Sequence, residues 1–352
     1  MRKYLFLFMI FIIAGQVVLA IEASGDYNIN ASATWYDGDY RTDFNDILNI
    51  DLYLLEIAGS ELQYSFTVTD PLLDLLEDRN PSYLTRKLYL RHRFDDFLLT
   101  VGRQPVSWSF GSLLNPVDFT PGSVIADRES SGKYTDALEL YVPLNWNSGF
   151  SIVTSYPGGF STDFNKMKFG VRGRFGVEGY DLTVNYVQEP HSLRNPFFPR
   201  ERVGLTIKGD LKDMGIYAAF GHYFDEILDS SNSFLLGIDY SYELSYQTRL
   251  AMQLEYLGLG SNRLIPVLGP FYFMNGKGDR LDLLCASLGY PLDDFSSITL
   301  MTMLNLDGSR IYISPIYRNT LANNIDFTLS GQFFSGGEDG FTALSTGFSY
   351  SF

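Results

Sequence analysis

Basic side chains recur at every second position in two short segments, and this spacing is the feature of the sequence best suited to act on a charged solute. Residues 166–174 read KMKFGVRGR and residues 87–93 read KLYLRHR. Successive side chains of a β-strand point to opposite faces, so each segment would carry positive charges ~6.6 Å apart on one face. In a confined lumen such a column sets the electrostatic potential that a solute meets.

Neighbouring segments extend these basic columns. The full set of candidate pore-lining residues is Lys87, Arg91, Arg93, Lys166, Lys168, Arg172, Arg174, Arg202, Lys208, Arg249 and Arg310. Acidic residues expected on the same face are fewer, namely Asp51, Glu139, Asp181, Glu255 and Asp326. Two interpretations stay open: a wall that favours anions or binds hydroxylated solutes, and a network of ion pairs without selectivity.

The elements that would hold these columns are strands with one apolar and one polar face. In residues 324–333, NIDFTLSGQF, the apolar residues alternate with Asp, Thr and Ser, and residues 48–54, 62–68 and 202–208 alternate in the same way. Many such segments run about ten residues, as a tilted membrane-spanning strand needs, whereas strands of soluble sheets usually have about five to six. Without a later apolar run of ~18 residues, the chain could cross a membrane only as a closed barrel.

The pattern predicts an all-β fold, a transmembrane antiparallel β-barrel of about 18 strands, with 16–20 open. The expected strands begin near Tyr27, Asp46, Glu61, Leu84, Asp96, Lys133, Gly149, Asn165, Gly179, Glu201, Asp213, Ser233, Tyr246, Arg280, Phe295, Ser309, Ala322 and Gly340. Connections after odd-numbered strands are expected to be mostly long, such as 37–44, 70–83, 104–132 and 258–279, and those after even-numbered strands short. Long outer loops and short periplasmic turns are typical of bacterial outer-membrane barrels.

The N-terminus predicts export. Residues 1–20 begin with Arg2 and Lys3, continue as an apolar run and end on small residues, with residue 23 as the latest cleavage position. This is the order of a signal peptide. An uncleaved membrane anchor is the alternative, and Gly15 and Gln16 argue against it because they interrupt the run. Residues 21–352 would then form the barrel in the outer membrane.

Composition agrees with an exported barrel. Aromatic residues make up 16% of the chain, which suits a wall that meets lipid on one side and water on the other. The formal net charge of -15 argues against nucleic-acid binding. Because Cys285 is the single cysteine, there is no internal disulfide, and stability must come from packing and hydrogen bonds.

One long connection breaks the alternation. Residues 102–121 read GRQPVSWSFGSLLNPVDFTP, in which the prolines remove donors for a strand ladder and the apolar side chains need something to pack on. We expect residues 104–132 to fold inward and narrow the pore, or to pack over the rim or a neighbouring subunit. The candidate constriction residues are Arg103, Trp108, Phe110, Asn115, Asp118, Asp127 and Glu129, of which the last three are acidic and are expected to face the basic columns.

This connection resembles a segment of bacterial outer-membrane porin-like barrels. The matching residues are Gly102-Arg103-Gln104, Trp108 and Asn115-Pro116-Val117-Asp118, which are similar to a Gly-Arg-Gln, Trp-Gly and Asn-Pro-x-Asp run. The sequence departs from that run at Ser109, where glycine is usual. The resemblance implies a porin-like barrel, in whose general form the third loop narrows the pore, and it names no solute.

The C-terminus resembles the signal by which outer-membrane barrels are recognised by their assembly machinery. The last residues, GFSYSF, place Phe348, Tyr350 and Phe352 on one face of a strand. The alternative is a strand that happens to end there. The signal-like segment implies that the barrel-assembly machinery is a partner.

Residues suited to catalysis or metal binding are sparse. His92, His191 and His222 lie far apart, and no Cys/His cluster has metal-ligand spacing. Neither a GxxxxGK loop nor a GxSxG elbow occurs. Outer-membrane phospholipases carry Ser and His on the outer barrel wall, so His222 is the one candidate for such chemistry, and a position beside rim aromatics is the simpler interpretation. We therefore expect no catalytic residue, metal or cofactor.

Together these patterns predict a porin-like channel for passive diffusion of small hydrophilic solutes, anions among them. The alternatives are a plugged structural or adhesion barrel without transport and, third, a lipid-modifying barrel enzyme. Expected partners are outer-membrane lipid and glycolipid, the assembly machinery and the solutes, with a homo-oligomer left open and nucleic acid excluded.

Overall fold

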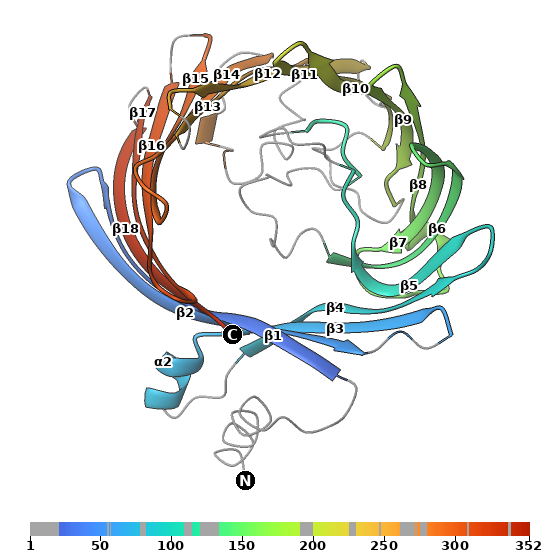
Figure 1. Ribbon diagram of the computed structural model, residues 1–352, viewed down its shortest axis with the longest axis horizontal. Helices are drawn as coiled ribbons and strands as arrows, with labels where there is room; N and C mark the ends of the chain where they lie inside the picture. The colour runs from blue at the N-terminus through green and yellow to red at the C-terminus, as the bar shows by residue number, and fades with distance from the viewer. Residues whose placement is uncertain are drawn as a thin grey trace.

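The strands of this chain close into a single ring, seen end-on in the computed structural model of Figure 1. The structure describes residues 21–54, 56, 58–77, 82–108, 115–119, 134–190, 200–224, 230–245, 248–260, 271, 273–274, 280–307, 310–336 and 339–352. The strands are β1 (Ile21–Tyr36), β2 (Asp39–Leu54), β3 (Ser60–Thr69), β4 (Ser82–Arg93), β5 (Leu98–Pro105), β6 (Tyr134–Asn145), β7 (Ser148–Tyr156), β8 (Lys168–Val177), β9 (Tyr180–Gln188), β10 (Glu201–Leu211), β11 (Met214–Phe224), β12 (Ser231–Glu243), β13 (Arg249–Leu259), β14 (Leu281–Pro291), β15 (Ser296–Asn305), β16 (Arg310–Ala322), β17 (Ile325–Gly336) and β18 (Asp339–Ser351).

Every strand pairs antiparallel with its neighbours in chain order, and β1 pairs with β18 to close the ring. The predicted fold, an antiparallel barrel of about 18 strands, is confirmed. From β3 onward each strand begins within three residues of its predicted start. Within the described residues, no helix has both the length and the apolar character needed to cross a membrane. The predicted signal peptide, residues 1–20, lies outside the described residues.

The first outer connection is shorter than expected. In place of a loop over 37–44, β1 and β2 continue to a two-residue turn at Asp37 and Gly38, with φ of 50° and 84°. Two successive positive φ angles are those of a type I′ hairpin turn, for which Asp-Gly is a preferred pair. The polar residues Arg41 and Asp43 made this segment look like a loop, although they lie on one face of β2.

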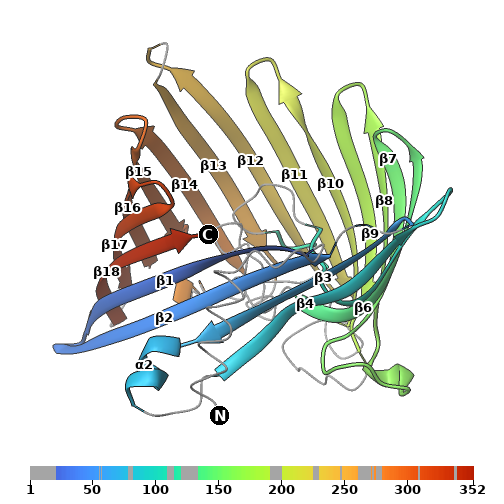
Figure 2. The same cartoon turned by 60° about the horizontal axis from the view of Figure 1, so that its bottom comes forward.

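The second outer connection, expected as a loop over 70–83, contains the short helix α2 (Pro71–Leu76). Its proline at the first helical position fits the helix start, where no backbone donor is needed. In Figures 1 and 2 the helix lies outside the ring beside β2. The Leu72 amide donates to the Asp46 carboxylate over 2.8 Å, which ties the helix to the outer face of that strand.

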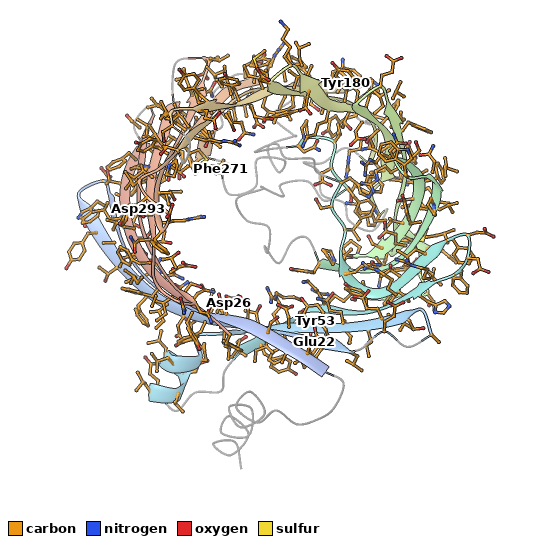
Figure 3. The ribbon with its side chains drawn as sticks, viewed as in Figure 1. Glu22, Asp26, Tyr53, Tyr180, Phe271 and Asp293 are labelled. Atoms are coloured by element: carbon orange, nitrogen blue, oxygen red, sulfur yellow. The ribbon has the colours of Figure 1, made fainter. Side chains whose placement is uncertain are left out.

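Side chains project both outward from the ring and into it, as Figure 3 shows. On β4, Leu88 and Leu90 point outward and are 50% and 48% exposed, while Tyr89 between them points inward and is 6% exposed. The same alternation on β10 leaves Val203 and Leu205 on the outside. An apolar outer face on a closed ladder is what a bilayer requires, because lipid offers no partner to backbone N–H and C=O groups.

Candidate functional site

The described parts of the connection after β5, residues 106–108 and 115–119, lie inside the ring (Figure 1). Three of its apolar side chains, Val106, Trp108 and Phe119, are buried against inward-facing Val153 of β7 and Val187 of β9. These described parts, residues 106–108 and 115–119, are called the inner loop below. Its apolar side chains therefore pack on the lumen side of the wall.

Two cations of the wall hold the inner loop through its backbone. Arg202 of β10 donates from Nη2 to the carbonyl oxygens of Asp118 and Phe119 over 2.9 and 2.8 Å. Lys168, the first residue of β8, donates from Nζ to the Phe119 carbonyl over 2.5 Å. Charged donors make hydrogen bonds worth about 1.5–3 kcal/mol, so these contacts are a strong anchor for a segment without secondary structure.

Glu189, just after β9, pairs with both cations and offsets one of their two positive charges. Its Oε1 lies 2.9 Å from Lys168 Nζ and 2.7 Å from Arg202 Nη1. Burial raises the pKa of Glu189, but the two adjacent cations outweigh burial and leave the pKa below its ordinary value. The carboxylate therefore stays charged at neutral pH. Lys168, Glu189 and Arg202 are called the loop anchor below; sequence reasoning did not include Glu189, because it follows the strand and enters the set only through tertiary contact.

Polar side chains shape the inner loop from within. Asp118, fully buried, accepts hydrogen bonds from Ser107 Oγ at 2.7 Å and from the Trp108 amide at 2.5 Å. Asn115 Oδ1 accepts from the Val117 amide at 3.0 Å. Of the candidate constriction residues, Trp108, Asn115 and Asp118 thus lie together. Phe110, Asp127 and Glu129 lie outside the described residues.

Arg103, another candidate constriction residue, belongs to β5 rather than to the loop. It lies opposite Leu88, which is on the outer face, and its Nη1 is 3.6 Å from Asp136. Its Nε also donates to the Thr85 carbonyl over 2.7 Å. The alternation therefore places Arg103 on the outside of the wall near its outer end.

Three glycines on the inner wall let the loop approach. A Cβ at Gly170 of β8 would lie 2.7 Å from ring atoms of both Trp108 and Phe119, and one at Gly204 or Gly221 would lie 2.8 or 2.6 Å from the Val117 side chain. Contacts under 3.0 Å force a neighbour to shift. Glycines at inward positions of otherwise regular strands were a signal, unused in reading the sequence, that chain packs against this face.

The basic column on β8 flanks the inner loop. Lys168 Nζ lies 4.5 Å from the centre of the Phe119 ring, and Arg172 Cζ lies 5.4 Å from that of Trp108, both at cation–π distances. Arg174 pairs with Asp181 over 2.9 Å farther along the strand. Lys166 was expected in this strand, but it is exposed and lies in a short 3-10 helix, Phe164–Lys166, ahead of it.

The column on β4 is paired with acids. Lys87 lies 3.7 Å and Arg86 3.4 Å from Asp51, and Arg91 lies 3.5 Å from Glu61. Strict alternation would have placed Arg86 on the lipid side. A register shift in the β3–β4 pairing lets it turn inward, where it is 3% exposed. A bulge of this kind leaves little trace in the alternation pattern, so Arg86 was missed.

The remaining candidates are dispersed. Lys208 faces inward opposite Asp181, Arg93 is exposed at the end of β4, and Arg249 is exposed 3.6 Å from Glu243. Arg310 of β16 donates from Nη1 to the Phe273 carbonyl. The structure thus brings together Lys168, Arg172 and Arg202 at the inner loop, and it leaves Arg93 and Arg249 at the far ends of their strands.

The long connection expected over 258–279 has described residues that pack on the inner face of the wall, and this inward packing was not predicted. Phe271 and Met274 are buried against inward-facing Leu283 and Met303, and Asn305 Nδ2 donates to the Met274 carbonyl over 3.1 Å. Figure 3 shows Phe271 on the inner side of the ring. The signal was available in residues 263–274, RLIPVLGPFYFM, a run too apolar for a solvated loop.

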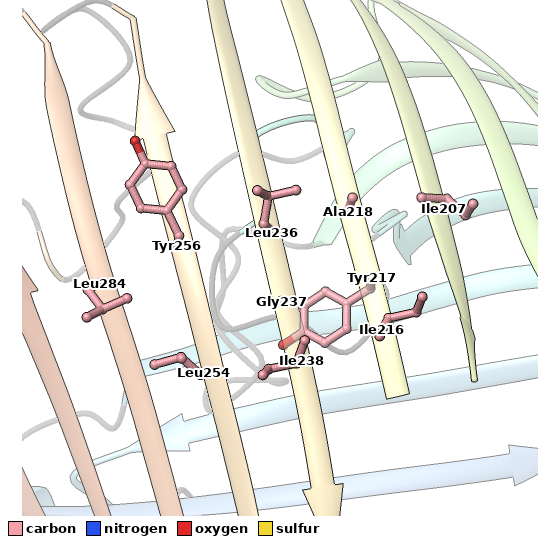
Figure 4. A pocket seen from close by; sticks show the side chains of 10 residues that line it. All are labelled: Ile207, Ile216, Tyr217, Ala218, Leu236, Gly237, Ile238, Leu254, Tyr256 and Leu284. Atoms are coloured by element: carbon pink, nitrogen blue, oxygen red, sulfur yellow. The ribbon is translucent and has the colours of Figure 1, made fainter. Parts of the chain in front are cut away.

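The structure also shows the surroundings of His222, the one candidate for lipid-modifying chemistry, and of possible metal and ligand sites. His222 faces outward, with Nδ1 2.7 Å from Asn232 Oδ1 and its ring edge-on to Phe224. Among the described residues no group of three or more His, Cys, Asp or Glu side chains could hold a metal. The apolar hollow of Figure 4 lies on the outer wall between β10 and β14 and is lined by residues such as Leu236, Ile238 and Leu254.

The C-terminal aromatics follow the expected face. Phe348 and Tyr350 point outward and are 46% and 48% exposed, and the Phe352 ring stacks on Tyr350 at 6.1 Å. The backbone of Phe352 exchanges two hydrogen bonds with Gly25, so the end of the chain is tied to β1.

Comparison with known proteins identifies the architecture. No family model matches the sequence, and no curated protein matches it. Solved structures do match. Pseudomonas aeruginosa OccD3 (OpdP) matches at 8% identity with a TM-score of 0.59, and the match covers 94% of this chain and 91% of OccD3. Acinetobacter baumannii OccAB4 matches at 9% identity and 0.60, over 95% and 98%. A mutant of the Rh. blastica porin matches at 12% identity and 0.50, over 94% and 100%. At these identities the likeness establishes the fold, and the fold is that of porin barrels.

Proposed function

We propose that this chain is an outer-membrane channel through which small hydrophilic solutes, anions in particular, diffuse passively. The porin fold supports the channel, and the inner loop held against the wall supports a narrowed passage. No chemistry is needed: a solute is selected by size beside the loop and by charge along the basic columns.

Arg172 carries the proposed anion preference. Its cross-strand neighbours on the inner wall, Ser151 of β7 and Asn185 of β9, are both neutral. Its Cζ lies 5.4 Å from the centre of the Trp108 ring, so its charge lies beside the inner loop that we propose narrows the lumen. The carboxylates of Glu139 and Asp118 interact electrostatically with Arg172 and oppose this effect, but neither lies directly across the ladder. We infer that the guanidinium beside the low-dielectric loop still attracts anions to that level of the lumen.

Single-channel recording in planar bilayers tests the proposal. We expect conductance, with reversal potentials in a salt gradient that indicate anion preference. Replacing Arg172 and Arg174 by Ser should weaken that preference, whereas Arg249→Ser, which removes one exposed charge far from the loop, should change it less. Cation selectivity of the unmodified protein would refute the basic-wall argument, and absence of conductance under every condition would favour a plugged barrel.

Deletion of residues 106–119 tests the role of the loop separately. If the inner loop narrows the passage, its removal should raise conductance and leave the barrel assembled. An assembled deletion variant with unchanged conductance would mean that the loop lies aside from the solute path. Folding of that variant is checked by the resistance of the barrel to unfolding in detergent.

A further inference from the structure

The outer part of β2 has an unpaired edge. Figures 1 and 2 show the β1–β2 hairpin reaching past the end of β3, beside α2. Pairing with β3 ends at Ile47 and Thr69, whereas pairing with β1 continues to Asp39. Residues 39–45 are all exposed, and no strand among the described residues pairs with their second side. These seven residues are called the open edge below.

The hairpin geometry determines which backbone groups the open edge presents. In a two-residue hairpin the residues flanking the turn, Tyr36 and Asp39, form a hydrogen-bonded pair, and such pairs recur at every second residue. Residues 39, 41, 43 and 45 therefore direct their N–H and C=O groups toward β1. Tyr40, Thr42 and Phe44 direct theirs away from it, to the open side.

Asp46 supports this assignment and closes the edge. Asp46 continues the series 40, 42 and 44, whose backbone groups point away from β1. Its backbone oxygen accepts from the Asp70 amide at 2.7 Å, and its amide donates to Asp70 Oδ1 at 3.3 Å. The open edge is thus bounded by the turn at Gly38 and by Asp70. Thr42 is its middle residue.

The sequence of the open edge, DYRTDFN, is complementary to itself when two copies run antiparallel about Thr42. Thr42 then lies opposite Thr42 of the second copy, Arg41 opposite Asp43, and Tyr40 opposite Phe44. Opposite charges and aromatic pairs across a ladder are stabilising. In this register the two copies of Thr42 form a hydrogen-bonded pair. Every N–H and C=O group that residues 40, 42 and 44 direct to the open side therefore gains a partner in the second copy.

We propose that the open edge pairs antiparallel with the same residues of a second copy of this chain, held in a facing membrane. The two-fold axis that relates antiparallel neighbours stands perpendicular to their sheet. Because the sheet of a barrel stands upright in the membrane, this axis lies in the membrane plane and turns the second barrel upside down. The inference rests on the proposed outer-membrane location and on the expected position of the β1–β2 turn outside the membrane; the pairing then joins two facing outer membranes.

A short strand pair makes a small interface, so a single contact is weak, and many barrels in two apposed membranes reinforce it. An unpaired edge left in solvent is a template for such pairing. Arg41 and Asp43, which bind each other within the strand at 2.8 Å, give the edge a charge pattern that selects this register.

Cysteine cross-linking tests the register. In a Cys285→Ser background, Thr42→Cys should form disulfide dimers in concentrated detergent solution, because hydrogen-bonded antiparallel pairs have Cα atoms ~5.5 Å apart, within disulfide range. Asp39→Cys is the control: it is also exposed, it leaves the Arg41–Asp43 and Tyr40–Phe44 pairs intact, and in the proposed register its two copies are more than ~7 Å apart, too far for a disulfide. Equal cross-linking of both variants, or none with Thr42→Cys, would overturn the proposal.

Charge exchange tests partner choice. Arg41→Asp alone should lower the cross-linked fraction of Thr42→Cys roughly tenfold, because attractive pairs become repulsive. Adding Asp43→Arg should restore pairing between two exchanged copies but not between an exchanged and an unexchanged copy. If the doubly exchanged copy cross-linked equally well with exchanged and unexchanged copies, the proposed register would be contradicted.

Two populations of cells that carry Thr42→Cys with different epitope tags test the facing geometry. Dimers containing both tags are expected after mixing and mild oxidation. Dimers with one tag only would overturn the facing arrangement. Conductance of the reduced variant measures channel function independently, so failure of the pairing and failure of the proposed function give different results.

Discussion

Gly170 is the position where one added methyl group tests the packing of the inner loop. An alanine Cβ there would lie 2.7 Å from atoms of the Trp108 and Phe119 rings, whereas ordinary contact begins at 3.4 Å. Both rings must withdraw, or β8 must bend. Overpacking of this kind costs about 1–3 kcal/mol, which is comparable with one of the charged hydrogen bonds of the loop anchor. Gly170→Ala should therefore loosen the loop, and Gly170→Val should displace it.

The fluorescence of Trp108 reports this displacement. With Trp35 and Trp146 replaced by Phe, emission comes only from Trp108, which is 6% exposed in the native loop. We expect the red shift and the acrylamide quenching to increase from the unmodified protein to Gly170→Ala and then to Gly170→Val. Channel conductance should rise in the same order if the displaced loop clears the lumen.

Gly158→Ala is the matched control, since a Cβ there meets nothing within 4 Å. It should leave fluorescence and conductance unchanged. If Gly170→Val also left quenching unchanged while the barrel was folded, the loop would not pack on β8 as described, and the reasoning from the glycines would be refuted.

Two further predictions concern the loop anchor and the C-terminus. Because the pKa of Glu189 is lowered in the folded protein, its stabilising effect is full above the pKa that an unfolded Glu has, about 4.3, and is lost as pH falls through the lower folded value. Acid titration should therefore expose Trp108 to quencher only well below neutral pH. The variant Glu189→Gln should expose Trp108 already at pH 7 and should remove the pH dependence of quenching. If the titration of this variant were the same as that of the unmodified protein, the role of Glu189 in the loop anchor would be contradicted. Phe352→Ser should lower the yield of assembled barrel, measured as the heat-modifiable band in gel electrophoresis. Ser351→Ala is the control. Equal yields of the two variants would show that the terminal aromatic residue is not needed for assembly.

The fold was predictable because a barrel wall between lipid and water imposes a period of two that few other structures sustain. The apolar face of residues 324–333 and its polar partner face were readable without any tertiary information. The predicted loop over 37–44 was wrong because the polar side chains there are typical of a loop, whereas the backbone continues as strands. Arg41 and Asp43 are polar yet belong to β2, because they stand on a hairpin that extends beyond its neighbour β3.

The candidate site was only partly predictable. Apolar residues such as Trp108 indicated that the long connection must pack on something, and alternation placed Arg172 on the inner face. The anchor joins Phe119 to Lys168 and Arg202 across 49 and 83 residues, and local pattern carries no information about such pairs. Arg86 was missed for a local reason, since one register shift reverses the face of a residue.

The pairing of β1 with β18 has a consequence for the order in which the barrel can form. All other neighbours in the ring are consecutive along the chain, so their contacts are hairpins that close quickly. The β1–β18 pair joins residues such as Tyr27 and Tyr350, which lie almost at opposite ends of the chain, so its contacts have the highest entropic cost of closure in the ring and are expected to form last. Until then the sheet has two unsatisfied edges, which a bilayer does not tolerate. Closure of this seam is therefore the step at which folding and membrane insertion must coincide.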